Sequence, residues 1–212
     1  IFIGPNATTA YVPIWGSIED ELEANGIPAT TVQQGDTSEN TPALDWDQTP
    51  GFRVEVLASG NGGLIGGPED SSTEGMKGNN DSTVMRLTFN GVSFITTGDA
   101  EYYTEYDIID AYGRDAVGAD LVQIGHHGND DATSELWLDN VSPRVALVSN
   151  AMIEAQLLKE VVTQGIRSVD ADYFVTDRVF PNTPRNVEPT YGNLIAVTDG
   201  ETIEIVLDRD PW

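Results

Sequence analysis

Short apolar runs alternate with amphipathic runs along the whole chain. Strands are predicted by runs that are continuously apolar or apolar at every second position, at residues 1–4, 29–33, 53–59, 119–125, 144–150 and 172–177. Helices are predicted by runs with apolar residues three and four positions apart, at residues 17–26, 100–113, 134–140 and 152–165. Strands that alternate with helices are typical of α/β proteins.

Two further segments predict hairpins. Residues 83–99 hold two alternating apolar runs around Asn90-Gly91, a dipeptide that favours a tight two-residue turn. Residues 193–207 repeat the arrangement around Asp199-Gly200. No internal repeat or linker is visible, so we expect one α/β layered domain. Its longest loops, rich in Gly, Ser, Asn or Pro, are expected at residues 59–82 and 178–192.

The charge of the chain is its strongest compositional feature. Thirty-five acidic residues face ten basic ones, for a net charge of −25, and the acids are spread along the whole sequence. Such a charge opposes the compact state unless salt screens it. We therefore expect a protein adapted to high salt, with an ordinary acidic protein as the alternative. The charge also disfavours nucleic-acid binding through a basic patch, because phosphate contacts need Lys and Arg.

Composition excludes some classes of protein. With no cysteine, the chain has no disulfide and no thiolate metal ligand. No run approaches 18 apolar residues, so no membrane-spanning helix is expected, and no signal peptide is visible. The first residue is Ile1 and not Met, which suggests a fragment or a processed product.

The candidate chemistry lies directly after two predicted strands. Asp99 follows one of them, and His126-His127, the only histidines of the chain, follow the next. If these strands are neighbours, their carboxyl ends bring Asp99 and a histidine to the edge where α/β sheets bind ligands. Carboxylate and imidazole are ligands for Zn²⁺, Mn²⁺ or Fe. Side chains alternate along a strand, so we expect one histidine to ligate and the other to contact substrate or orient the first.

Each of these signals also has an ordinary structural explanation. Asp99 alone fits a turn or a helix N-cap, the histidine pair fits a hydrogen-bonded loop, and residues 78–81 (GNND) fit a turn. The order and spacing of the three signals together favour a functional site.

These motifs, taken in order, resemble the metallo-β-lactamase-like domain of ComEC-type competence (DNA-uptake) proteins. The resemblance covers residues 79–207 well and residues 1–58 more loosely. It rests on Asn79 with Ser82, Gly98-Asp99, Glu105, His126-His127-Gly128, Ser142-Pro143 with Ala146, and Thr176-Asp177.

The resemblance implies an α/β fold of the αββα four-layer sandwich type, in one domain over residues 1–212 that lacks its N-terminal strands. It implies two divalent ions, zinc or manganese, which activate water for attack on a phosphodiester. Asp99 and one histidine of the pair would bind metal. His126 is the expected ligand because it follows the strand directly, with His127 turned towards substrate, and the reverse assignment stays open. Asp99 and His127 would be catalytic. The resemblance places Asn79, Ser82 and Glu105 against the substrate or behind the ligands. A DNA substrate and an extracytoplasmic or membrane-associated parent protein would follow.

Two departures from the family pattern keep other functions open. The His-x-His-x-Asp-His motif is absent, so most metal ligands would have to lie upstream of residue 1. The Gly-His-Pro stretch of the family is also missing after residue 148. This segment alone offers too few ligands for a tight metal site. The alternatives are a non-catalytic copy with a binding or structural role, and a metallohydrolase of small esters or lactones.

Overall fold

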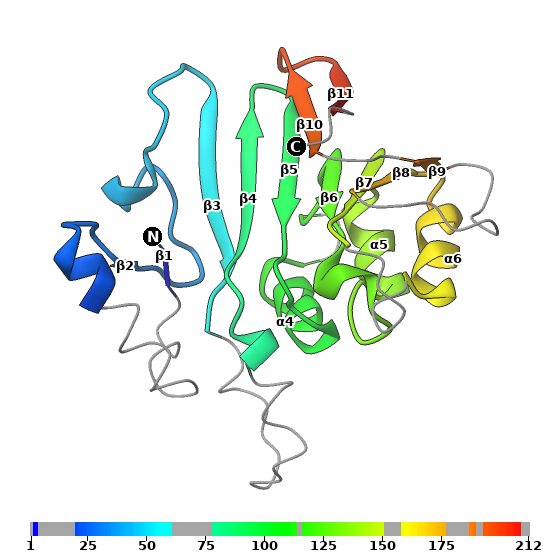
Figure 1. Cartoon of the computed structure of the whole chain (residues 1–212), viewed down its shortest axis with the longest axis horizontal. Helices are drawn as coiled ribbons and strands as arrows, with labels where there is room; N and C mark the ends of the chain where they lie inside the picture. The colour runs from blue at the N-terminus through cyan, green and yellow to red at the C-terminus, as the bar shows by residue number, and fades with distance from the viewer. Residues whose placement is uncertain are drawn as a thin grey trace, which may run out of the picture.

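The computed structural model describes residues 2–3, 20–60, 78–113, 116–150, 158–176, 187–189 and 193–208. Its main element is a seven-stranded sheet in the order β3-β4-β5-β6-β7-β8-β9 (Figure 1). The strands β3 (Phe52–Ala58), β4 (Val84–Phe89) and β5 (Val92–Thr96) pair antiparallel. The rest of the sheet runs parallel to β5, through β6 (Leu121–Gln123), β7 (Val145–Val148), β8 (Asp172–Val175) and β9 (Val187–Pro189).

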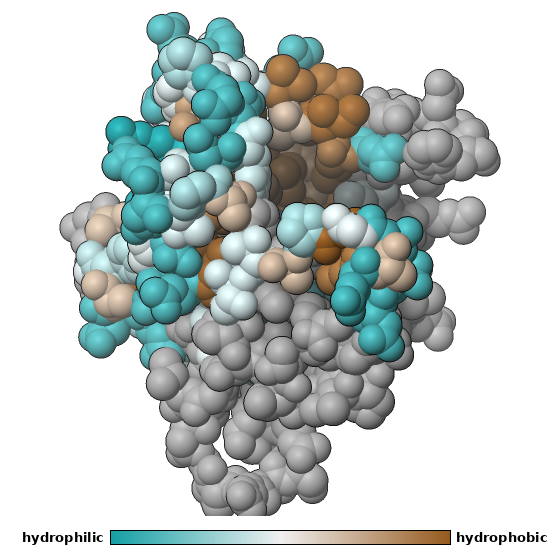
Figure 2. All heavy atoms as spheres, turned by 90° about the vertical axis from the view of Figure 1, so that its left-hand side faces the viewer, coloured by the Kyte–Doolittle hydropathy of each residue, from teal (hydrophilic) through white to brown (hydrophobic). Residues whose placement is uncertain are grey.

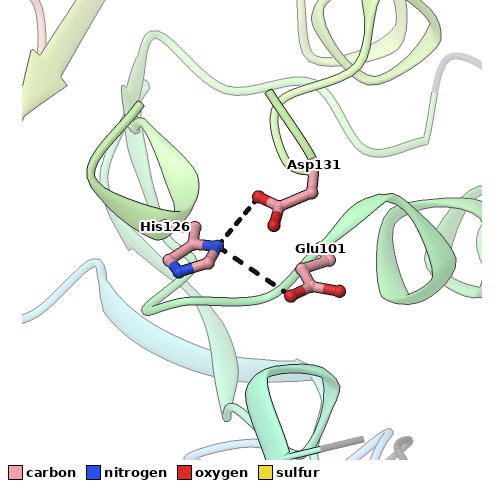
Figure 3. Close-up of side chains that lie close together, drawn as sticks. All are labelled: Glu101, His126 and Asp131. Carbon is pink, nitrogen blue, oxygen red and sulfur yellow. Dashed lines mark hydrogen bonds and ion pairs between the residues drawn. The ribbon is translucent and has the colours of Figure 1, made fainter. Parts of the chain in front are cut away.

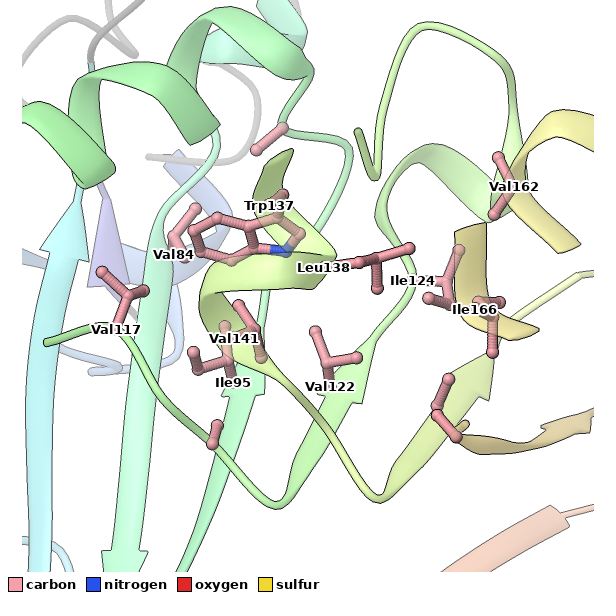
Figure 4. Packing of buried hydrophobic residues seen from close by; sticks show 14 of the residues in the cluster. Val84, Ile95, Val117, Val122, Ile124, Trp137, Leu138, Val141, Val162 and Ile166 are labelled. Atoms are coloured by element: carbon pink, nitrogen blue, oxygen red, sulfur yellow. The ribbon is translucent and has the colours of Figure 1, made fainter. Parts of the chain in front are cut away.

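Three helices cover one face of this sheet. They are α4 (Tyr102–Tyr112), α5 (Glu135–Val141) and α6 (Glu160–Ser168). Their apolar sides pack on strand residues such as Ile95 and Val122, and Trp137 of α5 is one of the buried side chains of this cluster (Figure 4). Burying these side chains supplies the main stabilisation of the sheet, at about 25 cal/mol for each Å² of apolar surface.

The opposite face of the sheet is also apolar. Successive side chains of a strand point to opposite faces, and in β5, β6 and β7 both faces carry apolar residues. Phe94, Leu121 and Leu147 stand next in sequence to residues that face the helices, and they line a cavity of about 460 Å³ on the other side. The far wall of this cavity is a two-stranded sheet of β10 (Asn193–Thr198) and β11 (Ile203–Asp208). Figure 2 shows hydrophobic residues in its upper part, at the level where Figure 1 places β10 and β11.

A second apolar cluster lies near the start of the chain. Val32 and Leu44 pack on Val54, Val56 and Met85 of strands β3 and β4. The short strands β1 (Phe2–Ile3) and β2 (Thr30–Thr31) form a separate parallel pair, and the 3₁₀ helix η1 (Pro42–Leu44) precedes β3. The sequence expectation of a mixed α/β architecture is confirmed.

Most of the predicted turns and helix ends are confirmed. Asn90, with φ of 51°, turns β4 into β5. Gly113 ends α4 with φ of 84°, and the Ser134 hydroxyl caps α5 by accepting the Trp137 N–H. The helix predicted at residues 17–26 is helical at residues 20–24, and Ser17 lies outside the described residues. Most of the predicted loop at 59–82 also lies outside them, while residues 78–80 form a helical turn.

Two predictions were wrong in detail. Residues 152–157 of the helix predicted at 152–165 lie outside the described residues. In the described part, residues 158 and 159 are not helical and α6 begins at Glu160. Leu158 packs against Gly128 and the Lys159 N–H donates to the Gly128 carbonyl, which keeps residue 159 extended. Strand β9 lies inside the segment predicted as a loop at 178–192. Pro189 is tolerated there because β9 stands last in the sheet order, where a missing N–H costs little. No helix among the described residues is long and apolar enough to cross a membrane.

Candidate functional site

Polar side chains collect where the parallel strands end. Asp99 follows β5, His126 and His127 follow β6, Ser149 follows β7, and Thr176 follows β8. Because β5 and β6 are parallel neighbours, Asp99 and the histidines reach the same edge of the sheet, as the sequence predicted. Ligands of open α/β sheets bind at this edge.

The Asp99 turn is fixed from two sides. The Ser82 hydroxyl accepts the Asp99 N–H at 3.3 Å, and the Gly98 carbonyl accepts the His126 N–H at 3.2 Å. Gly98 has φ of 57° and stands so close to Ser82 that an added Cβ would lie 3.3 Å from the hydroxyl. Glycine is therefore suited to this position by conformation and by space.

The two histidines adopt an unusual backbone. They lie in the short segment η4 (Gly125–Gly128), and His126 and His127 have φ of 45° and 57°. Non-glycine residues rarely take the left-handed region, and they cluster at functional sites when they do. As a result the two rings point to different partners, with centroids 6.4 Å apart.

His127 is the histidine that meets Asp99. Its Nδ1 lies 2.7 Å from the Ser149 carbonyl oxygen, and its Nε2 lies 3.4 Å from Oδ1 of Asp99. A carbonyl only accepts, so Nδ1 carries the proton and donates it. The amide of Asn150 donates to the His127 carbonyl at 2.6 Å, which holds the same turn to the end of β7. The side chains of Asp99 and His127 are each 42% exposed.

His126 turns to the other side, into an acidic cluster. Its Nδ1 lies 2.8 Å from Oδ1 of Asp131 and 3.9 Å from Oε1 of Glu101 (Figure 3). Glu101 is almost fully buried and accepts from the side-chain amides of Asn79 at 2.7 Å and Asn80 at 3.1 Å. Burial raises the pKa of the Glu101 carboxyl, because it disfavours the charged form.

Two groupings of side chains at this edge have the chemistry of metal ligands. Glu101, His126 and Asp131 bring three ligand atoms within 4.8 Å of one another. Those atoms already bond to one another or to amides, so an ion would have to replace these bonds. Asp99 and His127 instead aim a carboxylate oxygen at an imidazole nitrogen, with the other ring nitrogen held by a carbonyl. Metal-bound histidines in proteins are commonly oriented in this way.

Glu105 has a different position from these residues. It is 3% exposed and accepts the backbone N–H groups of Thr133 and Ser134, the latter at 2.9 Å. Burial raises its pKa as well, although the two N–H donors act in the other direction. Glu105 joins α4 to the start of α5 and thereby holds the loop that carries Asp131.

The residues singled out from the sequence fall into two neighbouring groups. The structure brings Ser82 and His127 to Asp99, whereas Asn79 bonds to Glu101 and lies with His126. The Thr176 hydroxyl accepts the Asn150 N–H, and Asp177 lies outside the described residues.

Sequence reasoning missed the partners of His126. Glu101 follows Asp99 by two positions, where a strand-based argument gives it no role. Asp131 stands five residues beyond His126 and meets it only because the loop folds back. The acidic pair Asp130-Asp131 after the histidines was the one signal that pointed to it.

Comparison with known proteins gives partial matches. No family model matches the chain. It is 32% identical over 71 residues to ComE operon protein 3 of Bacillus subtilis, covering 34% of this chain and 9% of that protein. It is 31% identical over 85 residues to Competence protein ComA of Neisseria gonorrhoeae, covering 40% and 12%. It is 36% identical over 72 residues to Recombination protein 2 of Haemophilus influenzae, covering 34% and 9%.

The chain spans about a tenth of the length of these curated relatives. The similarity therefore concerns one segment of much longer proteins. Over that segment, the chain is similar to competence-related proteins at low identity.

Proposed function

We propose that the chain carries the site of a metal-dependent phosphodiesterase of the metallo-β-lactamase superfamily that acts on DNA. The observation that carries the proposal is the Asp99–His127 pair. Oδ1 of Asp99 and Nε2 of His127 are 3.4 Å apart at the edge formed by the carboxyl ends of the strands. The Ser149 carbonyl fixes the tautomer of His127.

The pair fits a divalent cation. A carboxylate oxygen and an imidazole nitrogen are hard and intermediate donors that suit zinc or manganese. Among the described residues no third carboxylate or imidazole comes close enough to both to form a group with them, so a complete coordination shell needs further ligands. A bound ion would polarise a phosphoryl oxygen and lower the pKa of water.

The residues of this chain have separate roles in the proposal. Asp99 and His127 hold the ion, and the Ser82 hydroxyl keeps the Asp99 turn in place. We assign the ligand role expected for His126 to His127, because Asp99 pairs with His127. His126 is a positioning residue, held by Asp131, that keeps the turn in its left-handed conformation. Asn79 and Glu105 support this arrangement through Glu101 and the 129–134 loop.

The proposal includes the four-layer αββα sandwich. A helix layer covers one face of the main sheet, and the other face presents apolar side chains towards β10 and β11. Such a two-sided apolar sheet is expected at the centre of a layered sandwich. The hairpin β10–β11 would belong to the second sheet.

DNA is proposed as substrate because of the relatives, two of which are named as a competence protein and a recombination protein. A DNA-uptake context would place the parent protein at or outside the membrane. In this proposal water attacks the phosphorus and the P–O bond to one sugar oxygen breaks, which leaves a phosphomonoester and a free hydroxyl.

The test combines metal content with hydrolysis. Because the described ligands of this segment are too few, the segment alone is expected to be inactive, and the test uses the full-length parent protein. Purified in high salt, that protein should bind at least one equivalent of zinc or manganese by elemental analysis. It should hydrolyse bis-p-nitrophenyl phosphate and single-stranded DNA. Asp99→Ala should lower both hydrolytic rates by a factor of roughly 10³ or more, because it removes a metal ligand. Asp110→Ala, an exposed acid of α4, is the matched control and should retain activity.

Other outcomes identify the alternatives. Less than one equivalent of bound metal would favour a non-catalytic domain. Cleavage of small esters or lactones without cleavage of phosphodiesters would favour the esterase alternative. An Asp99→Ala protein that stays active would exclude the proposed site.

A further inference from the structure

Three tyrosines form a cluster of rings on the first turns of α4. The ring centroids of Tyr102 and Tyr103 lie 4.5 Å apart, and those of Tyr102 and Tyr106 lie 5.9 Å apart. Tyr103 and Tyr106 are 39% and 44% exposed. We call Tyr102, Tyr103 and Tyr106 the tyrosine cluster.

This cluster is not needed to attach α4 to the core. The helix buries Thr104, Glu105, Ile108 and Ile109 on one side. Tyr103 and Tyr106, three residues apart, are exposed on the outer side of the helix, and Tyr102 is half-buried beside them. Large exposed aromatic residues gathered on a strongly charged surface favour an interaction site.

The cluster adjoins the candidate site. The Tyr102 N–H donates to the Asp131 carbonyl at 3.0 Å, and the Asp131 carboxylate holds His126. Tyr102 also stands three residues after Asp99 in sequence. The cluster therefore begins at the helix turn that contacts the loop holding His126, which is next to His127 in the sequence.

Charge restricts how this chain can hold a nucleic acid. Only ten residues are basic against 35 acidic ones, and Arg53, Arg86 and Arg144 each pair with a carboxylate. Phosphates, which are ordinarily bound by Lys and Arg, would be repelled by this surface. Base faces carry no net charge and stack on aromatic rings.

We propose that the tyrosine cluster is a stacking platform for the unpaired bases of single-stranded DNA. The inference rests on the proposed function, which it deepens by naming the form of the substrate. Duplex DNA is excluded from the platform, because its base faces are stacked within the helix. Recognition through bases also predicts how the affinity for the strand depends on salt. Affinity should hold or rise with KCl, since salt screens the repulsion between phosphates and the acidic surface.

The test measures binding of a fluorescent oligo-dT strand by anisotropy in EDTA, from about 0.2 M to about 2 M KCl, so that no cleavage occurs. The Tyr103→Ala/Tyr106→Ala double variant should bind about tenfold more weakly or worse, as expected from the loss of base stacking. The Tyr103→Phe/Tyr106→Phe variant should restore binding, because phenylalanine keeps the ring. An abasic strand of equal length should bind wild type as weakly as the alanine variant binds oligo-dT.

Three results would overturn the inference. They are an unchanged affinity in the alanine variant, equal binding of duplex and single strand, and an affinity that falls steeply as salt rises. Hydrolysis of bis-p-nitrophenyl phosphate by wild type tests the proposed function separately, because that substrate has no base. If the strand binds through the tyrosines but bis-p-nitrophenyl phosphate is not hydrolysed, the proposed phosphodiesterase function has failed. If bis-p-nitrophenyl phosphate is hydrolysed but the tyrosines do not affect strand binding, the stacking platform has failed.

Discussion

His126 and His127 are neighbours in sequence but have different partners. Both lie in the left-handed region, at φ of 45° and 57°, which costs each of them of order 1 kcal/mol or more. The surrounding bonds offset this cost, from Asp131 to the first ring and from Ser149 to the second. The conformation sends one ring towards Asp99 and the other away from it.

The division of roles can be tested by NMR, because the chain has only two histidines and therefore four ring nitrogens. Titration with Zn²⁺ should move the Nε2 resonance of His127 strongly and leave the resonances of His126 nearly in place. The reason is that Nε2 of His127 faces Asp99 at 3.4 Å, whereas Nδ1 of His126 is bonded to Asp131.

A His127→Ala protein should lose the zinc effect, which identifies the resonance. If zinc instead shifts the ring nitrogens of His126 and leaves those of His127, then His126 is the ligand and the assignment made above is wrong.

Helix α4 organises the site at the level of elements. Its N-cap residue, Glu101, lies in the His126 cluster, and Glu105 of its first turn accepts hydrogen bonds from the start of α5. The loop between η4 and α5 is thus held from the helix side. This explains how a loop with few apolar residues keeps Asp131 in contact with His126.

Glu105→Ala should destabilise the fold. It leaves the N–H groups of Thr133 and Ser134 without their acceptor, and each buried unpaired group costs about 1–3 kcal/mol. We expect the free energy of unfolding to fall by roughly 2–4 kcal/mol in urea titrations at high salt. Asp110→Ala, on the exposed side of α4, should change it by less than about 0.5 kcal/mol.

The pH dependence gives this prediction a second readout. Burial raises the pKa of Glu105, so the native state binds its proton at higher pH than the unfolded state does. The stability from this group therefore increases as the pH falls through the raised pKa towards the ordinary value of 4.5. The Glu105→Ala variant lacks that increase. The difference in free energy of unfolding between wild type and variant should therefore become larger as the pH is lowered. A deficit that narrows on acidification would contradict this account of Glu105.

The net charge of −25 dominates the behaviour of the whole molecule. In dilute buffer the repulsion between the acidic side chains acts over long distances. At 1 M salt the Debye length is only about 3 Å, so this repulsion is largely screened. We propose that the protein is adapted to high salt. The midpoint of thermal unfolding, followed by circular dichroism, should rise steeply with KCl below about 1 M and flatten above it.

The shape of this curve separates two causes. Screening is nearly complete at about 1 M salt, whereas salting-out of apolar surface continues to strengthen beyond it. A midpoint that does not change between dilute buffer and 1 M KCl would rule out salt adaptation through charge. NaCl should act like KCl, because screening depends on ionic strength.

Much of the fold was predictable because local patterns control it. Alternation predicted β3, β4 and β5, and the Asn-Gly turn joined the last two. Helix caps at Ser134 and Gly113 set the bounds of α5 and α4. The start of α6 was not predictable, since it depends on a contact between Leu158 and Gly128, 30 residues earlier in the chain.

The sequence by itself determined the α/β alternation, the acidic surface, and the placement of Asp99 and both histidines at one edge of the sheet. Periodicity, turn chemistry and composition are local properties, so they can be read along the chain. Only the tertiary structure decided that His127 meets Asp99, that Glu101 and Asp131 surround His126, and that three tyrosines lie beside them. These relations depend on two consecutive left-handed residues and on a loop folded back onto α4, and no periodic pattern encodes either.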